Sequence, residues 1–228
     1  MDHLFNSIKL QFEAKANAVR AGQMKAYMKD RFEYYGVMAP ERKEIVKQVF
    51  DQWTWQGDQV FKDFFEQCWS SDFREFNYVA LDLARKYLKH MDSSGVNFYE
   101  PYIARDSWWD TVDFLSPSII GLLVIKEPDK QIQLMRKWIA SDNMWYRRSA
   151  LIMQLKYGKS TNFDILKSMI SNQFASKEFF IQKAAGWALR QYSRVDPIGV
   201  SSFISKHQLP PLTKREGMRL ILKEEGKW

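Results

Sequence analysis

Apolar residues recur along most of this chain at spacings of three and four, the pattern of amphipathic helices. Leu4, Phe5, Ile8 and Phe12 show it near the start, and residues 60–65 show it again. No window alternates with period two for long enough to predict a strand. Ten glycines and seven prolines argue against long loops and an all-β architecture. The pattern therefore predicts an all-α protein of roughly twelve helices, paired antiparallel and joined by short turns.

A block of eighteen residues occurs four times at a constant spacing of 35, without insertion or deletion. The copies begin at Ser70, Arg105, Ala140 and Ala175. A constant period means that each copy is one supersecondary unit stacked on the previous one, so that equivalent positions form columns on a shared surface. Each unit is expected to hold two helices, of which the block supplies the second. We predict one domain over residues 1–228, an α-solenoid whose inner helices line a concave surface.

The ends of the array are less regular than its middle. Residues 36–50 fit an earlier unit, because Lys43 lies 35 positions before Tyr78, and residues 213–222 fit a closing unit. The Trp-Leu-Gly-Tyr and Thr-Pro-Leu-His signatures of two common helical repeats are missing, which favours an irregular HEAT-like array. Near the start of three copies, Ser71, Ser141 and Ser176 are predicted helix N-caps.

Composition and charge narrow the function classes. The lone Cys68 excludes an intramolecular disulfide and a cysteine-based metal site, so we expect no metal and no cofactor. A net charge of +7 is compatible with a polyanionic partner, although an ordinary solvated basic surface would also explain it. No signal peptide pattern is present, and the longest apolar run, around Gly121, is too short to cross a bilayer. We therefore expect a cytoplasmic protein without a membrane partner. Polar solenoid ends favour a monomer.

Two columns of the repeat contain the charged and aromatic residues that could form a functional site. The first column holds Tyr78, Asp113, Arg148 and Lys183. The second column, one helical turn earlier, holds Arg74, Trp109, Met144 and Phe179. A carboxylate thus precedes two cations along the array, with an indole on the same helix face. Because helix layers lie roughly 10 Å apart, the Arg148 side chain could reach Asp113.

Two further residues bear on this face. Trp187 follows Lys183 by four positions and adds a second indole. Pro117 follows Asp113 by four positions and lacks the N–H that would bond the Asp113 carbonyl, which predicts a kink or break in that helix. Taken singly, these residues have ordinary explanations: a solvated Asp, packing tryptophans, and a surface ion pair worth under about 1 kcal/mol. Together they would make a poor core and a good binding site. The residues alone leave both interpretations open.

If this face is an active site, its residues limit the reaction. Nucleophilic catalysis by Ser or Cys lacks a base, because His3, His90 and His207 are scattered. Glycoside cleavage passes through an oxocarbenium-like transition state, normally with a second carboxyl group as acid. A purine alkylated at N3 or N7 already carries a positive charge and leaves as a neutral base, so no acid is needed. A carboxylate could stabilise the sugar cation and orient water, and indole faces attract both cations.

Three sequence runs resemble the AlkD-type alkylpurine DNA glycosylases, a family built of HEAT-like helical repeats. They are residues 107–113 (SWWDTVD), 145–150 (WYRRSA) and 176–183 (SKEFFIQK), the last followed by Gly186 and Trp187. The likeness extends over nearly the whole chain and includes Tyr27-Met28, Gly36-Val37, residues 155–157 (LKY) and residues 214–216 (KRE). The SWWDxVD run is the most specific part of it. The resemblance implies double-stranded DNA containing alkylated purines as the partner.

The resemblance also implies roles for matching positions. Asp113 would be the catalytic carboxylate, Trp109 and Trp187 would contact the sugar of the damaged nucleotide, and Arg148 would hold the adjacent phosphate. The further DNA contacts implied are Tyr27, Lys156, Lys183 and Arg190. Met38-Ala39 depart from the family, which often carries a hydroxyl residue before the proline of that turn, so a phosphate contact there is not implied.

Two functions follow from these observations. The first is a monofunctional glycosylase that hydrolyses the N-glycosidic bond of N3- or N7-alkylated purines in duplex DNA. In such an enzyme Lys183 is better explained as a phosphate contact than as a Schiff-base nucleophile. The alternative is a non-catalytic HEAT-like module that binds DNA structure or a protein. The intact set of Trp109, Asp113, Arg148 and Trp187 favours the enzyme.

Overall fold

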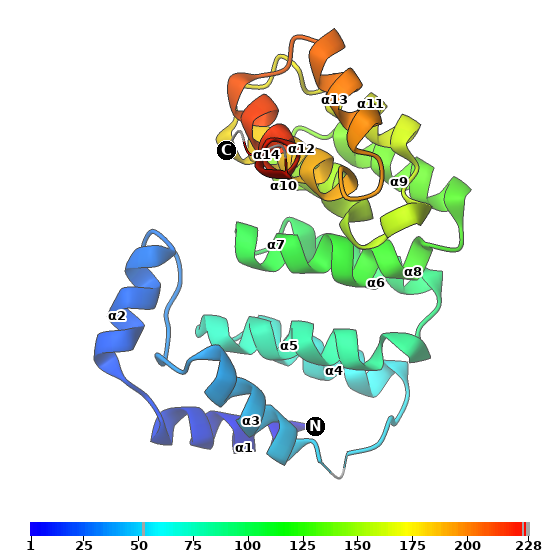
Figure 1. Cartoon of the computed structure of the whole chain (residues 1–228). Helices are drawn as coiled ribbons and strands as arrows, with labels where there is room; N and C mark the ends of the chain where they lie inside the picture. The colour runs from blue at the N-terminus through cyan, green and yellow to red at the C-terminus, as the bar shows by residue number, and fades with distance from the viewer. Residues whose placement is uncertain (52, 225, 227–228) are drawn as a thin grey trace. The chain divides into compact units, whose positions relative to one another are not determined.

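The computed structural model describes residues 1–51, 53–224 and 226, and within them the predicted all-α fold is confirmed (Figure 1). The described residues form no strand; an isolated β-bridge joins Glu33 and Phe73. Contacts divide the chain into two compact units, Met1–Met91 and Asp92–Trp228. A single domain over residues 1–228 stays a prediction.

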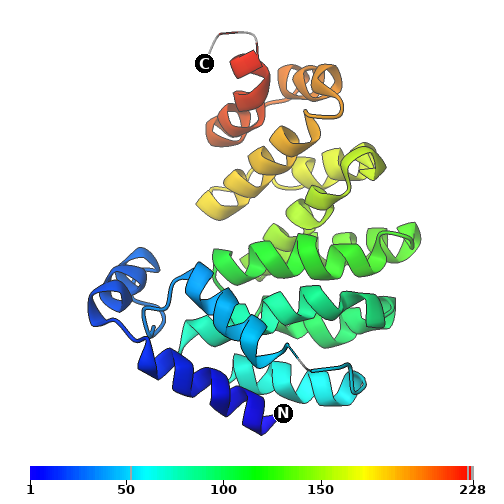
Figure 2. The same cartoon turned by 60° about the horizontal axis from the view of Figure 1, so that its bottom comes forward.

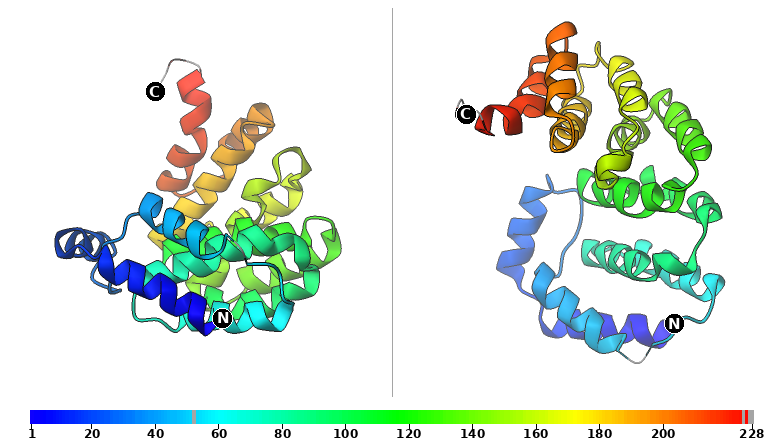
Figure 3. Two further views of the ribbon diagram at one scale, coloured as in Figure 1. Left: turned by 90° about the horizontal axis from the view of Figure 1, so that it is seen from below. Right: turned by 45° about the vertical axis from the view of Figure 1, so that its right-hand side comes forward.

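The described part of the first unit is built mainly of five α-helices. Its helices are α1 (Asp2–Ala14), α2 (Ala18–Tyr27), α3 (Ala39–Val49), α4 (Asp58–Trp69) and α5 (Arg74–Tyr87), followed by the short η1 (Leu88–His90). Helix α4 pairs with α5, and α1 packs on α3 and α4 (Figure 3). Aromatic side chains fill this packing: Phe5 and Phe12 of α1 both contact Phe76 of α5.

A buried carboxylate fixes the loop between α2 and α3. Glu75, on α5, is fully buried and accepts hydrogen bonds from the backbone N–H groups of Tyr35, Gly36 and Val37 at 3.3, 2.9 and 3.2 Å. Burial raises the pKa of the Glu75 carboxyl, and these N–H donors oppose that rise. The loop is therefore tied to α5, the second helix of the following repeat.

The second unit contains the remaining repeats in two layers. Its elements are η2 (Ser93–Gly95), α6 (Val96–Tyr99), η3 (Glu100–Ile103), α7 (Trp109–Leu115), η4 (Ser116–Ile120), α8 (Gly121–Val124), α9 (Pro128–Ile139), α10 (Met144–Ile152), η5 (Met153–Lys156), η6 (Gly158–Ser160), α11 (Phe163–Ser171), α12 (Phe179–Tyr192), α13 (Pro197–Lys206) and α14 (Pro211–Glu224). Helices α9, α11 and α13 form one layer, and α10, α12 and α14 form the other (Figure 1). Successive pairs follow one another through this unit in the turned view (Figure 2).

The 35-residue period is confirmed by the helix boundaries. The second helices of the repeats begin at Arg74, Trp109, Met144 and Phe179. The first helices α4, α9 and α11 begin at Asp58, Pro128 and Phe163, which keeps the same register. Helix α3 begins at Ala39, again 35 residues before α5, so the predicted earlier unit is confirmed. Residues at equivalent positions therefore lie on equivalent helix faces.

The predicted serine N-caps are wrong by two residues. The hydroxyls of Ser71, Ser141 and Ser176 accept the N–H groups of Phe73, Asn143 and Glu178, at 3.3, 3.1 and 3.4 Å. These hydrogen bonds close a turn before each helix, and the residues that donate them, Phe73, Asn143 and Glu178, are the actual N-caps. The serines compete for backbone N–H groups locally, as hydroxyl side chains do in turns.

The distortion predicted at Pro117 is confirmed. Helix α7 ends at Leu115, a π-helical segment covers Ser116–Ile120, and α8 continues the path. Two buried hydrogen bonds tie this segment and the start of α8 to the next repeat: the Ser116 hydroxyl donates to the Ser149 carbonyl at 2.8 Å, and the Tyr157 hydroxyl donates to the Gly121 carbonyl at 2.6 Å. The segment therefore holds α7 in a fixed position against α10.

The core is rich in aromatic side chains, and it includes Cys68, which is fully buried. Trp69, Trp138 and Phe64 are among its largest buried side chains. Of the helices described, none combines the length and the apolar character that a membrane span requires. Among the described residues, no cluster of three or more His, Cys, Asp or Glu side chains could hold a metal ion.

Candidate active site

The candidate site is organised by an ion pair between consecutive repeats. Arg148 on α10 donates from Nε to Asp113 Oδ1 and from Nη2 to Asp113 Oδ2, both at 2.7 Å. Only 6% of the Arg148 side chain and 17% of the Asp113 side chain are exposed. The predicted approach of these two residues is thus confirmed, in the two-point geometry that a guanidinium and a carboxylate favour. The remaining exposed part of the carboxylate is available to a ligand.

A third helix contributes to this arrangement. Arg148 Nη1 donates to the backbone carbonyl of Phe180 on α12 at 2.5 Å, and its guanidinium carbon lies 5.7 Å from the Phe180 ring centroid. Helices α7, α10 and α12 therefore meet at one guanidinium. Asp113, Arg148 and Lys183 lie on these three helices, which are the second helices of consecutive repeats. Tyr78 belongs to the other compact unit, and its place on the same surface stays a prediction.

Burial controls the electrostatics of Asp113. Removal from water raises the pKa of its carboxyl above the ordinary value, the hydrogen bonds and charge of Arg148 act in the opposite direction, and the charge of Asp110 adds a small further rise. A carboxylate in this environment is poorly solvated. It can stabilise an adjacent developing cation more strongly than an exposed carboxylate can.

A cluster of aromatic side chains lies next to the ion pair, and its member Phe180 lies beside Arg148. The rings of Trp108, Trp145 and Phe180 contact one another with centroids 5.2 to 5.6 Å apart. No role was predicted for these three rings from the sequence. A signal for them was the doubled tryptophan at 108–109, which directs two adjacent indoles to different sides. Trp109 stands one turn before Asp113 on α7 and is half-buried, as is Trp187 on α12.

The basic residues of α12 share an acidic partner that the sequence analysis did not assign. Lys183 Nζ lies 2.6 Å from Glu216 Oε1, and Arg190 Nη1 lies 2.5 Å from Glu216 Oε2. Burial acts to raise the pKa of the Glu216 carboxyl, but the hydrogen bonds and charges of both cations outweigh it and hold that pKa below its ordinary value. An amine that donates to a carboxylate in this way is poorly placed to act as a nucleophile. The period of 35 gave no signal for Glu216, because α14 departs from the register.

The other predicted DNA contacts lie outside this cluster. Lys156 is exposed at the end of η5. Tyr27 is 68% exposed at the end of α2, in the first unit. In the turn before α3, the backbone N–H of Met38 already has a partner within the protein, because it donates to Glu41 Oε2 at 3.1 Å. The roles of Tyr27 and Lys156 in DNA binding stay predictions.

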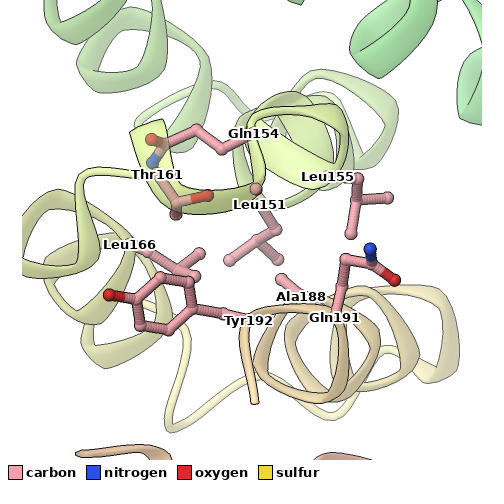
Figure 4. Close-up of a pocket in the computed structure, with 9 residues that line it drawn as sticks. Leu151, Gln154, Leu155, Thr161, Leu166, Ala188, Gln191 and Tyr192 are labelled. Atoms are coloured by element: carbon pink, nitrogen blue, oxygen red, sulfur yellow. The ribbon is translucent and has the colours of Figure 1, made fainter. Parts of the chain in front are cut away.

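A small pocket in the second unit does not belong to this site. It lies between α10, η5, α11 and α12 (Figure 4). Its lining is formed by Leu151, Gln154, Leu155, Gly158, Thr161, Leu166, Ala188, Gln191 and Tyr192. Its volume of about 10 Å³ is close to the minimum for one water molecule. It cannot hold a nucleobase, and it contains none of the predicted site residues.

Comparison with known proteins decides the family. Residues 8–221 match the family model described as DNA alkylation repair enzyme. The chain belongs to this family. A solved structure described as a predicted DNA alkylation repair enzyme from Enterococcus faecalis is 34% identical, with a TM-score of 0.84 over 91% of this chain and 97% of that one. The resemblance to AlkD-type proteins inferred from the SWWDxVD run is therefore confirmed.

Two more distant structures share the fold. AlkD2 from Streptococcus mutans is 19% identical, with a TM-score of 0.59 over 89% of this chain and 98% of that one. The protein smu.31 from Streptococcus mutans UA159 is 17% identical, with a TM-score of 0.59 over 78% of this chain and 90% of that one. No curated protein matches the chain. The family and the fold together identify a DNA alkylation repair enzyme built of stacked helical pairs.

Proposed function

We propose that this DNA alkylation repair enzyme is a monofunctional DNA glycosylase that hydrolyses the N-glycosidic bond of cationic N3- and N7-alkylated purines in duplex DNA. The observation that carries the proposal is Asp113 itself: a largely buried carboxylate, held at two points by Arg148. Two half-buried indoles, Trp109 and Trp187, lie on the helices of the same cluster. These are the parts needed to stabilise a sugar cation.

The reaction needs no acid from the protein. When the bond between the sugar and the alkylated base breaks, its electron pair passes to the base nitrogen and cancels the positive charge of the base. The base leaves neutral, and the sugar becomes an oxocarbenium-like cation. Asp113 stabilises this cation and orients a water molecule, whose oxygen bonds to the sugar carbon. One proton is released, and the products are the free base and an abasic site.

The DNA contacts of the proposal are basic and aromatic. Arg148 would interact with the phosphate adjacent to the lesion, and the side chains assigned to further contacts are Tyr27, Lys156, Lys183 and Arg190. Such contacts neutralise phosphates without reading base edges, which predicts salt-sensitive, nearly sequence-independent binding. We expect a monomer in the cytoplasm that uses neither a metal nor a cofactor.

Release of free base from methylated duplex DNA tests the proposal. We expect rapid release of 7-methylguanine and 3-methyladenine, whereas hypoxanthine, uracil and 8-oxoguanine persist because they would leave as poor anions. Asp113→Asn is expected to lose roughly a hundredfold or more in rate, the scale of removing a main electrostatic stabiliser. Asp129→Asn, which makes the same charge change at an exposed position on α9, is the matched control and should keep its rate.

Two results would reject this assignment. Efficient excision of a neutral lesion would require an acid that the proposal does not contain, and full activity of Asp113→Asn would remove the proposed role of Asp113. Far-UV circular dichroism and the melting temperature of each variant separate lost activity from lost structure. DNA binding without release of any alkylated base would instead support the non-catalytic module.

A further inference from the structure

One face of α12 carries a cation, an indole and a second cation. Lys183, Trp187 and Arg190 are spaced by four and three residues, so their side chains leave the same face of the helix. The seven residue-to-residue steps from Lys183 to Arg190 span about 10 Å of helix axis. Trp187, the indole assigned to the sugar of the damaged nucleotide, lies between the two cations.

A carboxylate of α14 links these cations. Glu216 directs one oxygen to each, while only 10% of its own side chain is exposed. The cations remain more accessible: 37% of the Lys183 side chain and 27% of the Arg190 side chain are exposed. The three charges sum to +1, so the group keeps a net attraction for anions. The carboxylate is more deeply buried than the two cations, and part of each cation faces solvent.

The backbone places Glu216 at this position. Gly186, on α12, lacks a Cβ where α14 approaches, and a Cβ added there would lie 2.5 Å from the Glu216 Cβ and 3.0 Å from the Thr213 carbonyl oxygen. The Thr213 hydroxyl donates to the Gln182 carbonyl at 3.0 Å, which ties α14 to α12 at the same level. Gly186 therefore allows α14 to approach α12 closely at one point, and Glu216 is the α14 residue that lies there.

We infer that Glu216 is a positioning residue, which holds Lys183 and Arg190 in a fixed two-point arrangement for DNA phosphates on either side of the nucleotide contacted by Trp187. The inference rests on the proposed function. Long basic side chains lose rotamer freedom when they bind, and ordering them beforehand lowers that cost. If Glu216 acted only as a counter-ion, its negative charge would repel phosphates, and its loss would strengthen DNA binding. If Glu216 positions the two cations, its loss weakens DNA binding.

The test compares two variants that change the net charge equally. Glu216→Gln removes the linking carboxylate, whereas Glu224→Gln removes an exposed one further along α14. We expect Glu216→Gln to weaken binding to undamaged duplex DNA about five- to twentyfold, and to lower the slope of log K against log salt by about 1 to 2, because up to two phosphate contacts are lost. Glu224→Gln should stay within about twofold of wild type, since surface charge alone changes.

A third variant leaves every charge in place. Gly186→Ala displaces α14 and thereby Glu216, so it is expected to weaken binding in the same direction. The salt slope is the decisive readout, because partial unfolding lowers the active fraction without changing the slope of the folded molecules. Melting temperatures are measured in parallel.

Equal or tighter binding by Glu216→Gln than by Glu224→Gln, with wild-type protein binding normally, would overturn the inference and leave the proposed function standing. If wild-type protein neither bound duplex DNA nor released alkylated bases, the proposed function and this inference would fail together. Weakened binding by Glu216→Gln with an unchanged salt slope would also count against the positioning role, since no phosphate contact would have been lost.

Discussion

Replacement of Arg148 tests how much of the site depends on one guanidinium. Arg148→Ala removes two hydrogen bonds to Asp113 and one to the Phe180 carbonyl. Removing one partner of a buried ion pair typically costs 3–5 kcal/mol, because the remaining charge is left without compensation. Asp113 retains 17% exposure, and the deleted side chain leaves room for water. We therefore expect a loss of about 3 kcal/mol near neutral pH, the lower end of that range.

This loss should depend on pH, and its sign follows from Asp113. Burial already raises the pKa of Asp113 in the folded protein, and Arg148 opposes that rise. Without Arg148 the pKa rises further, so the folded variant binds a proton that the unfolded chain has released. Stability then falls as pH rises from the unfolded pKa through the folded pKa. The deficit relative to wild type should be smallest in acid, where Asp113 is protonated in both states, and should grow towards neutral pH.

Urea unfolding of wild type, Arg148→Ala, Asp113→Asn and the double variant, at several pH values, measures this deficit. In the Asp113→Asn background, Arg148→Ala should lower the free energy of unfolding by at least about 1 kcal/mol less than it does in wild type. That difference is the coupling free energy of the pair. A deficit that is the same at every pH, or costs that add without coupling, would refute the reasoning. The first result would mean that Asp113 does not respond to the guanidinium, and the second that the pair has no net energetic link.

Three further predictions concern the frame and the DNA contacts. Tyr157→Phe should lower the free energy of unfolding by about 0.5–1.5 kcal/mol, because the buried hydrogen bond from the Tyr157 hydroxyl to the Gly121 carbonyl is lost; thermal unfolding measures this, and a change under about 0.3 kcal/mol would contradict it. Gly121→Ala should destabilise more, since its Cβ would lie 2.6 Å from the Met153 carbonyl oxygen, whereas Gly22→Ala, in open space on α2, should stabilise by about 0.5–1 kcal/mol. Lys156→Ala should weaken duplex DNA binding equally for unrelated sequences, as titrations on two duplexes would show; a sequence-dependent effect would indicate base contacts instead.

The regular part of the fold could be predicted because the signal is repeated. Each copy of the eighteen-residue block predicts a helix at the same place in its repeat. A helical pattern that arose by chance in one copy would not recur in the other three. The pairing of Asp113 with Arg148 followed from the same periodicity, together with the reach of an arginine side chain. The distortion at Pro117 was predictable for a different reason, namely that proline lacks the N–H that the helix requires.

The errors and omissions occur where the signal is local or the register is lost. A serine near a helix start can close a turn or cap the helix, and sequence alone does not distinguish the two, which explains the wrong N-caps at Ser71, Ser141 and Ser176. Glu216 was not assigned a role because α14 begins at Pro211, outside the constant spacing. Its importance depends on a close approach at Gly186, and such an approach is a property of packing.

The spacing of the tertiary hydrogen bonds has a consequence for how the chain folds during synthesis. Several bonds between neighbouring repeats join residues 33 to 36 positions apart: Ser116 to Ser149, Arg148 to Asp113 and Tyr157 to Gly121. A repeat in the second unit can therefore dock as soon as the next 35 residues have left the ribosome. The N-terminal helix is different: Phe5 of α1 stacks on Phe76, 71 residues later. These aromatic contacts of α1 cannot form before α5 has been made, so the packing of α1 is completed only once the last long helix of the first unit is present.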